Sequence, residues 1–182
     1  MSKSIFEAGT PQNILAVLTN KDQRAALQAK LLAVFPKAAV VAVKLNVAGP
    51  IKSNPQLTSL FDEGLSHFNR LLAQHQVSPS LKTIKWHRET GQETFMVFNE
   101  SAEKMKRLAV NFEDRFELGR LFDVDVLTAK CGSQPLSRSD FGLAARRCLI
   151  CDRPAKECAR SRRHSVAELQ SKISQMYQTY FN

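Results

Sequence analysis

The sequence predicts an α+β fold, because segments with the two-residue period of a strand alternate with segments that have the 3.6-residue period of a helix. The predicted elements are a strand at 39–47, a helix at 56–76, strands at 80–88 and 94–98, a helix from 101 to about 112, and a strand at 121–127. This β-α-β-β-α-β order is that of the split βαβ, or ferredoxin-like, arrangement. Right-handed crossovers then place the first and last strands side by side and antiparallel in mid-sheet.

Each element of this core has a local reason in the sequence. Residues 39–47 are rich in β-branched valine, which favours a strand, and the pair Gly49-Pro50 ends it. The helix at 56–76 carries leucine and phenylalanine at helical spacing. Gly91 marks the turn between the next two strands, and Ser101 is the expected N-cap of the second helix.

Two helices are predicted before the core, within residues 10–35. Thr10 as N-cap and Pro11 at the first helical position are expected to open a short helix. Asn20 is expected to cap a second helix that Pro36 stops.

After the core, residues 129–182 are expected to form a basic, cysteine-bearing C-terminal helical extension. Its last helix begins at Ser165, with Glu168 as the capping-box partner. A chain of 182 residues is long enough for one domain with a substantial core. We therefore interpret residues 1–182 as a single domain, with the core at about 38–128.

The chain is strongly basic, with a formal net charge of +9, and residues 138–163 hold eight Arg or Lys against three acids. Such a protein usually meets a polyanion, although a merely solvated face is the alternative. No apolar run reaches the roughly 18 residues that span a membrane, and the N-terminus lacks an apolar stretch typical of a secretory signal. We expect a cytoplasmic protein whose four cysteines are thiols or metal ligands rather than disulfides.

The strongest chemical pattern is the pair Asp123 and Asp125. Two carboxylates at i and i+2 on a strand point to the same face. Apolar neighbours predict that this strand is mostly buried, where like charges are costly unless a cation lies between them. Mg²⁺ prefers such oxygen ligands together with substrate phosphates, so we expect a metal site. The alternatives are a solvated sheet edge or pairing with arginines.

Three cations are expected beside this pair. Lys44 points to the opposite face from the valines of its strand, and that face adjoins Asp123 and Asp125 if the first and last strands are neighbours. The end of that strand runs into the loop that holds Lys52. If the two strands are neighbours, this end lies near Arg120, which directly precedes the last strand. Together they resemble the cationic clamp of a phosphoryl-transfer site, with a surface-loop lysine as the alternative for Lys52.

A second pattern is formed by Cys148, Cys151, Cys158 and His164. A Cys-x2-Cys pair is a common half of a structural zinc site, and three thiolates with one imidazole make a tetrahedral shell. The second half is irregularly spaced, and a helix from Pro154 capped by Asp152 is expected to orient Cys158 away from a simple knuckle. Buried reduced thiols are therefore the alternative to zinc.

The stretch from Gly119 to His164 carries a family resemblance. The runs Gly119-Arg120-Leu121-Phe122-Asp123-Val124-Asp125-Val126, Leu136-Ser137-Arg138, Arg146-Arg147-Cys148-Leu149-Ile150-Cys151 and Cys158-Ala159-Arg160 are similar to those of the citrate lyase holo-acyl-carrier-protein synthase family, CitX. The loop Gly49-Pro50-Ile51-Lys52 also resembles that family, and the similarity covers about residues 20–170. Ala144-Ala145 differs from the prolines expected there.

The resemblance implies a transferase. Members of the family move 2′-(5″-phosphoribosyl)-3′-dephospho-coenzyme A from its triphosphate precursor to a serine of the citrate lyase acyl-carrier subunit, with release of diphosphate. The resemblance also implies that Asp123 and Asp125 act as metal ligands or as a general base, with Mg²⁺ or Mn²⁺ as the metal. The basic side chains would bind the polyphosphate or steer an acidic carrier. The residues expected to bind substrate are Lys44, Lys52, Arg120, Arg138, Arg146, Arg147 and Arg160.

Two other functions are compatible with parts of the sequence. An arginine-rich nucleic-acid-binding module with a zinc knuckle would explain the charge and the cysteines. It would leave Asp123 and Asp125 unexplained, and the basic stretch has no regular aromatic interleaving, so we do not expect nucleic acid or membrane partners. An inactive scaffold of the lyase complex is the third possibility.

Overall fold

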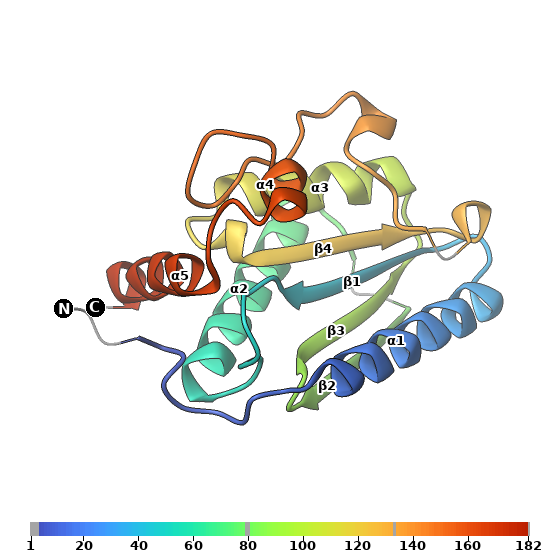
Figure 1. Cartoon of the computed structure of the whole chain (residues 1–182). Helices are drawn as coiled ribbons and strands as arrows, with labels where there is room; N and C mark the ends of the chain where they lie inside the picture. The colour runs from blue at the N-terminus through green and yellow to red at the C-terminus, as the bar shows by residue number, and fades with distance from the viewer. Residues whose placement is uncertain (1–3, 79–80, 133, 182) are drawn as a thin grey trace.

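The computed structural model describes residues 4–78, 81–132 and 134–181, which form a four-stranded sheet with helices on both faces (Figure 1). The helices are α1 (Ile14–Val34), α2 (Pro55–Gln74), α3 (Ala102–Arg115), α4 (Ala155–Ser161) and α5 (Val166–Phe181). The strands are β1 (Ala39–Leu45), β2 (Lys82–Arg88), β3 (Gly91–Phe98) and β4 (Phe122–Leu127). The prediction of an α+β fold is confirmed. No helix within the described ranges combines the length and apolar character needed to cross a membrane.

The strands lie in the order β2-β3-β1-β4, and every neighbouring pair is antiparallel. The predicted antiparallel pairing of the first and last core strands is confirmed, with Val43 of β1 opposite Val124 of β4. The prediction that both lie in mid-sheet is wrong for β4, which is an edge strand. Its outer edge is bonded not by a further strand but by the side chains of Glu113 and Arg146, described below, and by the Leu136 N–H, which donates to the Val126 carbonyl at 2.8 Å.

The two faces of the sheet bury different sets of side chains, because successive residues of a strand point to opposite sides. Val41 and Val43 of β1 belong to the main core, which β1 shares with α2 and α3. Val40 and Ala42 belong to a smaller cluster, which includes Leu31 of α1. In Figure 1, α1 runs along one face of the sheet, and α2 and α3 lie on the other.

The N-terminal segment forms the single helix α1, so the prediction of two helices within residues 10–35 is wrong. Asn13, rather than Thr10 or Asn20, is the N-cap, and its side chain accepts a hydrogen bond from the Ala16 N–H. Asn20 is buried in mid-helix, where its side chain donates to Oε1 of Glu93 on β3 at 2.5 Å. The capping residue expected from the sequence therefore serves a tertiary contact.

The C-terminal helix α5 begins as predicted. The carboxylate of Glu168 accepts from the Ser165 N–H at 2.7 Å, and the Glu168 N–H donates to the Ser165 hydroxyl at 3.2 Å, which completes the capping box. Ile173 of α5 is 1% exposed and belongs to the main core. The chain after β4 therefore contributes to the same core as the sheet.

Candidate functional site

The two aspartates lie on β4, on the sheet face opposite the one that this strand packs against α2 and α3. Lys44 lies opposite Asp123 in the register between β1 and β4. Its Nζ is 2.6 Å from Oδ2 of Asp123 and 2.7 Å from Oδ2 of Asp125. The predicted shared face of the two aspartates and its contact with Lys44 are confirmed. We call these three residues the carboxylate–lysine cluster.

In this cluster the opposite charges of the lysine and the aspartates stabilise each other and shift pKa values. Burial lowers the pKa of Lys44, but Asp125 and Asp123 outweigh it and raise that pKa above 10.5. Burial raises the pKa of Asp123, but Lys44 and Arg146 outweigh it and hold that pKa below 3.8. Both shifts favour the charged forms, so Lys44 and Asp123 are ionised at neutral pH.

Side chains cover the outer edge of β4. Oε1 of Glu113, on α3, accepts from the Val124 N–H at 2.9 Å. Arg146 donates through Nη2 to the Phe122 carbonyl and lies 3.2 Å from the same carboxylate oxygen of Glu113. Its Nη1 is 3.8 Å from Oδ1 of Asp123. Arg146 therefore connects the edge of the sheet to the carboxylate–lysine cluster.

Glu113 and Asp114 are site residues that were not among those predicted from the sequence. Nη2 of Arg138 lies 2.6 Å from Glu113 and 2.8 Å from Asp114, so these carboxylates hold the guanidinium beside α3. The available signal was electrostatic. Two adjacent acids in the last turns of a helix oppose the helix dipole, and they need cationic partners. The structure thus gives Arg138 an evident positioning contact.

Arg120 lies in the short 3-10 turn Gly119–Leu121, directly before β4. Its Nη2 donates to the Arg147 carbonyl, while its Nη1 is buried without a hydrogen-bond partner among the described residues. Burial and the neighbouring Arg146 lower the pKa of Arg120. A half-buried cation with an unused donor is costly, and an anionic ligand would relieve that cost.

A cavity of about 470 Å³ adjoins Arg120. It lies between the end of β1, the cysteine-bearing segment and the start of α5. As predicted, the end of β1 comes close to the turn that carries Arg120, because the Asn46 N–H donates to the Leu121 carbonyl at 2.7 Å. The walls of the cavity are largely apolar and include Val47, Leu149 and Leu169. Apolar walls with two cations, Arg120 and Arg162, suit an amphipathic, phosphorylated ligand.

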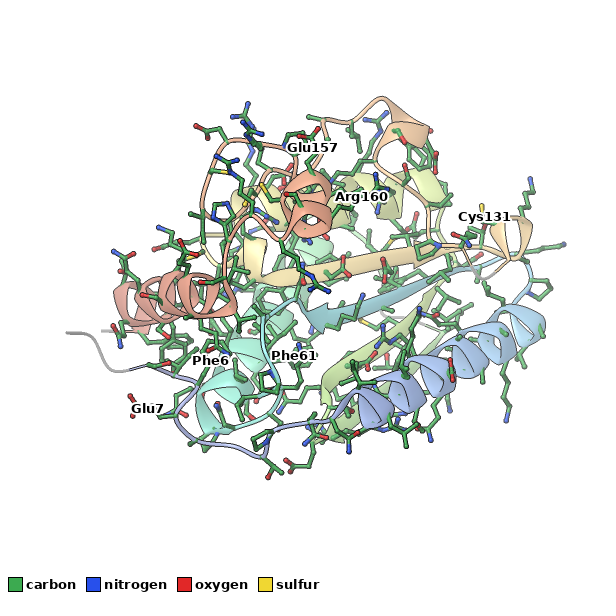
Figure 2. The ribbon with its side chains drawn as sticks, in the orientation of Figure 1. Phe6, Glu7, Phe61, Cys131, Glu157 and Arg160 are labelled. Atoms are coloured by element: carbon green, nitrogen blue, oxygen red, sulfur yellow. The ribbon has the colours of Figure 1, made fainter. Side chains whose placement is uncertain are left out.

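The other predicted substrate residues lie in different surroundings. Nζ of Lys52 donates to the Val47 carbonyl of its own loop at 2.8 Å, and burial lowers its pKa. The side chain of Arg147 is 74% exposed, and its Nη1 is 3.7 Å from Asp152. Arg160 is exposed on α4 (Figure 2). Contacts of the described residues bring Arg146, but not Lys52 or Arg160, directly to an aspartate of the cluster.

The structure also gathers Cys148, Cys151, Cys158 and His164, whose ligand atoms all lie within 4.8 Å of one another. The prediction that a helix from Pro154 turns Cys158 away from the other ligands is wrong. That helix, α4, is present, and its buried Cys158 points inward toward Cys151. Asp152 is not the cap of α4, since Pro154 occupies the N-cap position without a side-chain hydrogen bond.

The carboxylate–lysine cluster has the donor set for a divalent ion. Lys44 bonds Oδ2 of each aspartate, and among the described residues Oδ1 of Asp125 has no partner. The aspartate side chains are 36% and 23% exposed, so carboxylate oxygens remain accessible. Such hard oxygens are the ligands that Mg²⁺ and Mn²⁺ prefer. Lys44 already supplies one positive charge there, so a metal would share the cluster with it.

Comparisons with known proteins give one family. The family model described as apo-citrate lyase phosphoribosyl-dephospho-CoA transferase, CitX, matches residues 12–180. Protein CitXG of Leuconostoc mesenteroides subsp. cremoris is 35% identical over 175 residues, which are 96% of this chain but 37% of that protein. A probable apo-citrate lyase phosphoribosyl-dephospho-CoA transferase of Streptococcus pyogenes serotype M18 is 32% identical over 100% of this chain and 94% of its own length. One from Vibrio cholerae serotype O1 is 36% identical over 78% of each chain. The chain belongs to the CitX family, the apo-citrate lyase phosphoribosyl-dephospho-CoA transferases.

Proposed function

We propose that this chain transfers 2′-(5″-phosphoribosyl)-3′-dephospho-coenzyme A from its triphosphate precursor to a serine of the citrate lyase acyl-carrier subunit. The observation that carries the proposal is the pair of carboxylates on β4, both held by the Lys44 ammonium. The turn directly before this strand holds Arg120, whose Nη1 has no hydrogen-bond partner among the described residues. Family membership supports the transferase class and the apo-citrate lyase substrate. The nucleic-acid-binding alternative gains no support from the relatives named above.

In the proposed reaction the serine hydroxyl oxygen attacks the α-phosphorus of the triphosphate. A phosphodiester bond forms between the serine and the phosphoribosyl group, and the bond from the α-phosphorus to its bridging oxygen breaks. Diphosphate leaves with the electron pair of that bond, and the hydroxyl proton passes to a carboxylate. A divalent ion bound at this site would neutralise phosphate charge and polarise the α-phosphate.

We assign different roles to the two aspartates from their contacts. Asp123 contacts two cations, Lys44 and Arg146, which lower its proton affinity and suit it to hold positive charge in the site. Among the described residues Asp125 pairs directly with Lys44 only, through Oδ2, and its Oδ1 accepts no hydrogen bond. Asp125 is therefore the better acceptor for the serine proton. Lys44 fixes the distance between the two carboxylates and limits their repulsion.

Arg120 and the adjoining cavity are proposed to bind the precursor. Nη1 of Arg120 would donate to a phosphate oxygen, which gives this buried donor its missing partner. The largely apolar cavity walls would take a non-phosphate part of the molecule. Because Arg120 precedes β4 directly, this position lies close in the chain to Asp123.

The exposed cations around α4 are proposed to meet the carrier subunit. They belong to the segment between residues 146 and 164 and line neither face of the sheet. They are Arg147, Arg153, Lys156, Arg160, Arg162 and Arg163. Acyl-carrier proteins are typically acidic, so a basic surface beside the site would speed their association. A cytoplasmic location and a single domain remain predictions consistent with this role.

We also assign the β1–α2–β2–β3–α3–β4 core to the ferredoxin-like arrangement. The strand order with β1 and β3 in the centre supports this assignment, as does the position of α2 and α3 on one face. In this arrangement β4 is an edge strand, which leaves its aspartates accessible next to the segment that follows it.

The proposed function is tested by diphosphate release. The purified chain is incubated with precursor, Mg²⁺ and apo-carrier subunit, and diphosphate is measured over time. We expect release only when chain, precursor and carrier are all present, because the serine hydroxyl is the nucleophile. Release at the same rate without carrier would show hydrolysis instead and would contradict the transfer.

Replacing Arg120 by Met is expected to reduce kcat/KM for the precursor by about 10- to 100-fold, because a charge-assisted hydrogen bond contributes about 1.5–3 kcal/mol. The matched control is Arg107→Met, on the exposed part of α3, where Glu103 at i−4 is the ion-pair partner of the guanidinium among the described residues. Initial rates over a range of precursor concentrations measure the effect. Equal kcat/KM for both variants, with melting curves like wild type, would remove Arg120 from the substrate site.

A further inference from the structure

Four side chains without a chemical role in the proposed reaction form a compact cluster of metal-ligand atoms. Three of them, Cys148, Cys158 and His164, also line the cavity beside Arg120. The thiol sulfurs of Cys148, Cys151 and Cys158 and a ring nitrogen of His164 lie within 4.8 Å of one another. Sγ of Cys151 is 3.5 Å from Sγ of Cys158 and 3.4 Å from Nε2 of His164. A tetrahedral zinc ion with Zn–S bonds of about 2.3 Å places its ligand atoms about 3.8 Å apart. The four atoms therefore lie close to the spacing of a zinc shell and need only small shifts to reach it.

The backbone around Cys148 is built to hold a thiolate. Its sulfur accepts hydrogen bonds from the N–H groups of Cys151 and Ile150. The Cys148 N–H donates to the Arg153 carbonyl at 2.8 Å, which closes the chain into a tight hairpin around the Cys-x2-Cys turn. Hydrogen bonds of this kind orient and stabilise ligands in metal sites.

The third ligand, Cys158, lies on α4, and the fourth, His164, follows the turn that ends this helix. Cys158 is buried on the inner side of α4. At the end of this helix Arg162 adopts a left-handed conformation with φ +48°, which is unusual for a residue with a side chain. This turn reverses the chain and brings His164 back to Cys151. The strained conformation is offset if His164 gains a bond in that position.

Neither alternative explains all four positions. Reduced cysteines often pack as small apolar groups, but such packing does not require an imidazole among them. A disulfide between Cys151 and Cys158 needs a sulfur–sulfur bond of about 2.05 Å and leaves Cys148 and His164 without a role. A closed metal shell uses every one of the four.

We propose that Cys148, Cys151, Cys158 and His164 bind one structural Zn²⁺ ion, which fastens the basic segment 146–164 beside β4. Four protein ligands fill a tetrahedral shell, so the ion has no open position for substrate. The ion would also affect the carboxylate–lysine cluster, because its first ligand follows two arginines that contact residues in or beside that cluster. Arg146 and Arg147 directly precede Cys148, and through them the segment reaches the Phe122 carbonyl, Asp123 and Arg120.

Elemental analysis of the full-length chain, purified without chelator, tests the proposal. We expect about one zinc per chain. The variant Cys151→Ser should lose most of it, whereas Cys131→Ser should keep it, because Cys131 lies beyond the end of β4 and outside the cluster (Figure 2). Cobalt added to the zinc-free chain should give the thiolate charge-transfer and visible bands of a tetrahedral site, a readout that requires no variant.

Thiol titration and mass measurement give the opposing outcomes. The zinc-bound chain should show one freely reactive thiol, Cys131, and all four cysteines should react after denaturation with chelator. Four reactive thiols in the native chain, with little zinc and no tetrahedral cobalt spectrum, would overturn the proposal. A mass two units low, with a disulfide within the cluster and no metal, would overturn it as well.

The structural role has its own readout. Removing zinc should speed amide hydrogen exchange in residues 146–164 while the amides of β1 and β3 stay protected, because the core does not depend on the ion. Unchanged exchange in this segment would contradict the fastening role. None of these measurements depends on transferase activity, so the zinc proposal and the proposed function can fail separately.

Discussion

Replacing either Asp123 or Asp125 by Asn is expected to lower the rate of transfer to the carrier by at least ~10²-fold, as is usual for loss of a catalytic acid–base group. Asn keeps the size and much of the hydrogen bonding of Asp. Because its amide is neutral, it binds a metal ion weakly, and it cannot accept the serine proton. The Lys44 ammonium between the two positions would then face one carboxylate instead of two.

The measurement is the single-turnover rate of carrier modification for each variant. Asp62→Asn, on the exposed surface of α2, is the matched control and should transfer at the wild-type rate. If Asp125 is the proton acceptor, the acidic limb of the wild-type pH–rate profile should disappear in Asp125→Asn and persist, at a lower rate, in Asp123→Asn. Two folded Asn variants with near-normal transfer would refute the site.

The same variants test how the cluster contributes to stability. From the sequence alone, relief of repulsion between two aspartates predicts that Asn leaves stability unchanged or raises it. Lys44 reverses that expectation, because each Asn now removes a partner of a largely buried ammonium group. We expect a loss of about 1 kcal/mol, or roughly 2–4 °C in Tm. A Tm above that of wild type would show that repulsion dominates.

The pKa shifts set the pH range of this contribution. The lowered pKa of Asp123 stabilises the fold above its unfolded value near 3.8, and that stability is lost as the pH falls below it. The raised pKa of Lys44 stabilises the fold below 10.5, and that stability is lost as the pH rises through its folded value. The stability difference between Asp123→Asn and wild type should therefore be greatest between these limits.

Replacing Lys44 by Met is the second change with a large expected effect. It leaves two neighbouring carboxylates without their shared cation, and breaking a partly buried ion pair in this way costs about 2–3 kcal/mol. We expect Tm at pH 7 to fall by roughly 4–10 °C. Repulsion should raise the pKa of one carboxylate in the variant, so its stability should recover on acidification from pH 7 to 5, where wild type changes little.

Divalent metal gives this variant a sharper test. If the two aspartates bind Mg²⁺, the ion can replace the missing ammonium, so added Mg²⁺ should raise the Tm of Lys44→Met more than that of wild type. Lys30→Met, on the exposed side of α1, is the control and should show neither the Tm loss nor the metal response. A Lys44→Met variant that is insensitive to Mg²⁺ would argue against metal binding by this pair.

Local patterns predicted the sheet and the centre of the site well. Alternation along 39–47 and 121–127 fixed which side chains share a face, and the pairing of β1 with β4 then brought Lys44 to Asp123 and Asp125. These contacts follow from period-two geometry and one topological rule, so a single sequence is sufficient to find them.

Predictions that needed distant partners failed. Asn20 has the sequence context of a helix cap, but its side chain bonds Glu93 across the space between α1 and β3, so the helix continues through it. The role of Glu113 likewise depends on an unpaired edge N–H of β4, which no local pattern reveals.

The measurement that tests the proposed transfer most directly is the intact mass of the carrier subunit after incubation with this chain, the triphosphate precursor and Mg²⁺. We expect the carrier to gain the mass of one phosphoribosyl-dephospho-coenzyme A group, attached to a serine, and we expect chelator to prevent the gain. A carrier of unchanged mass, with folded chain, precursor and Mg²⁺ all present, would contradict it.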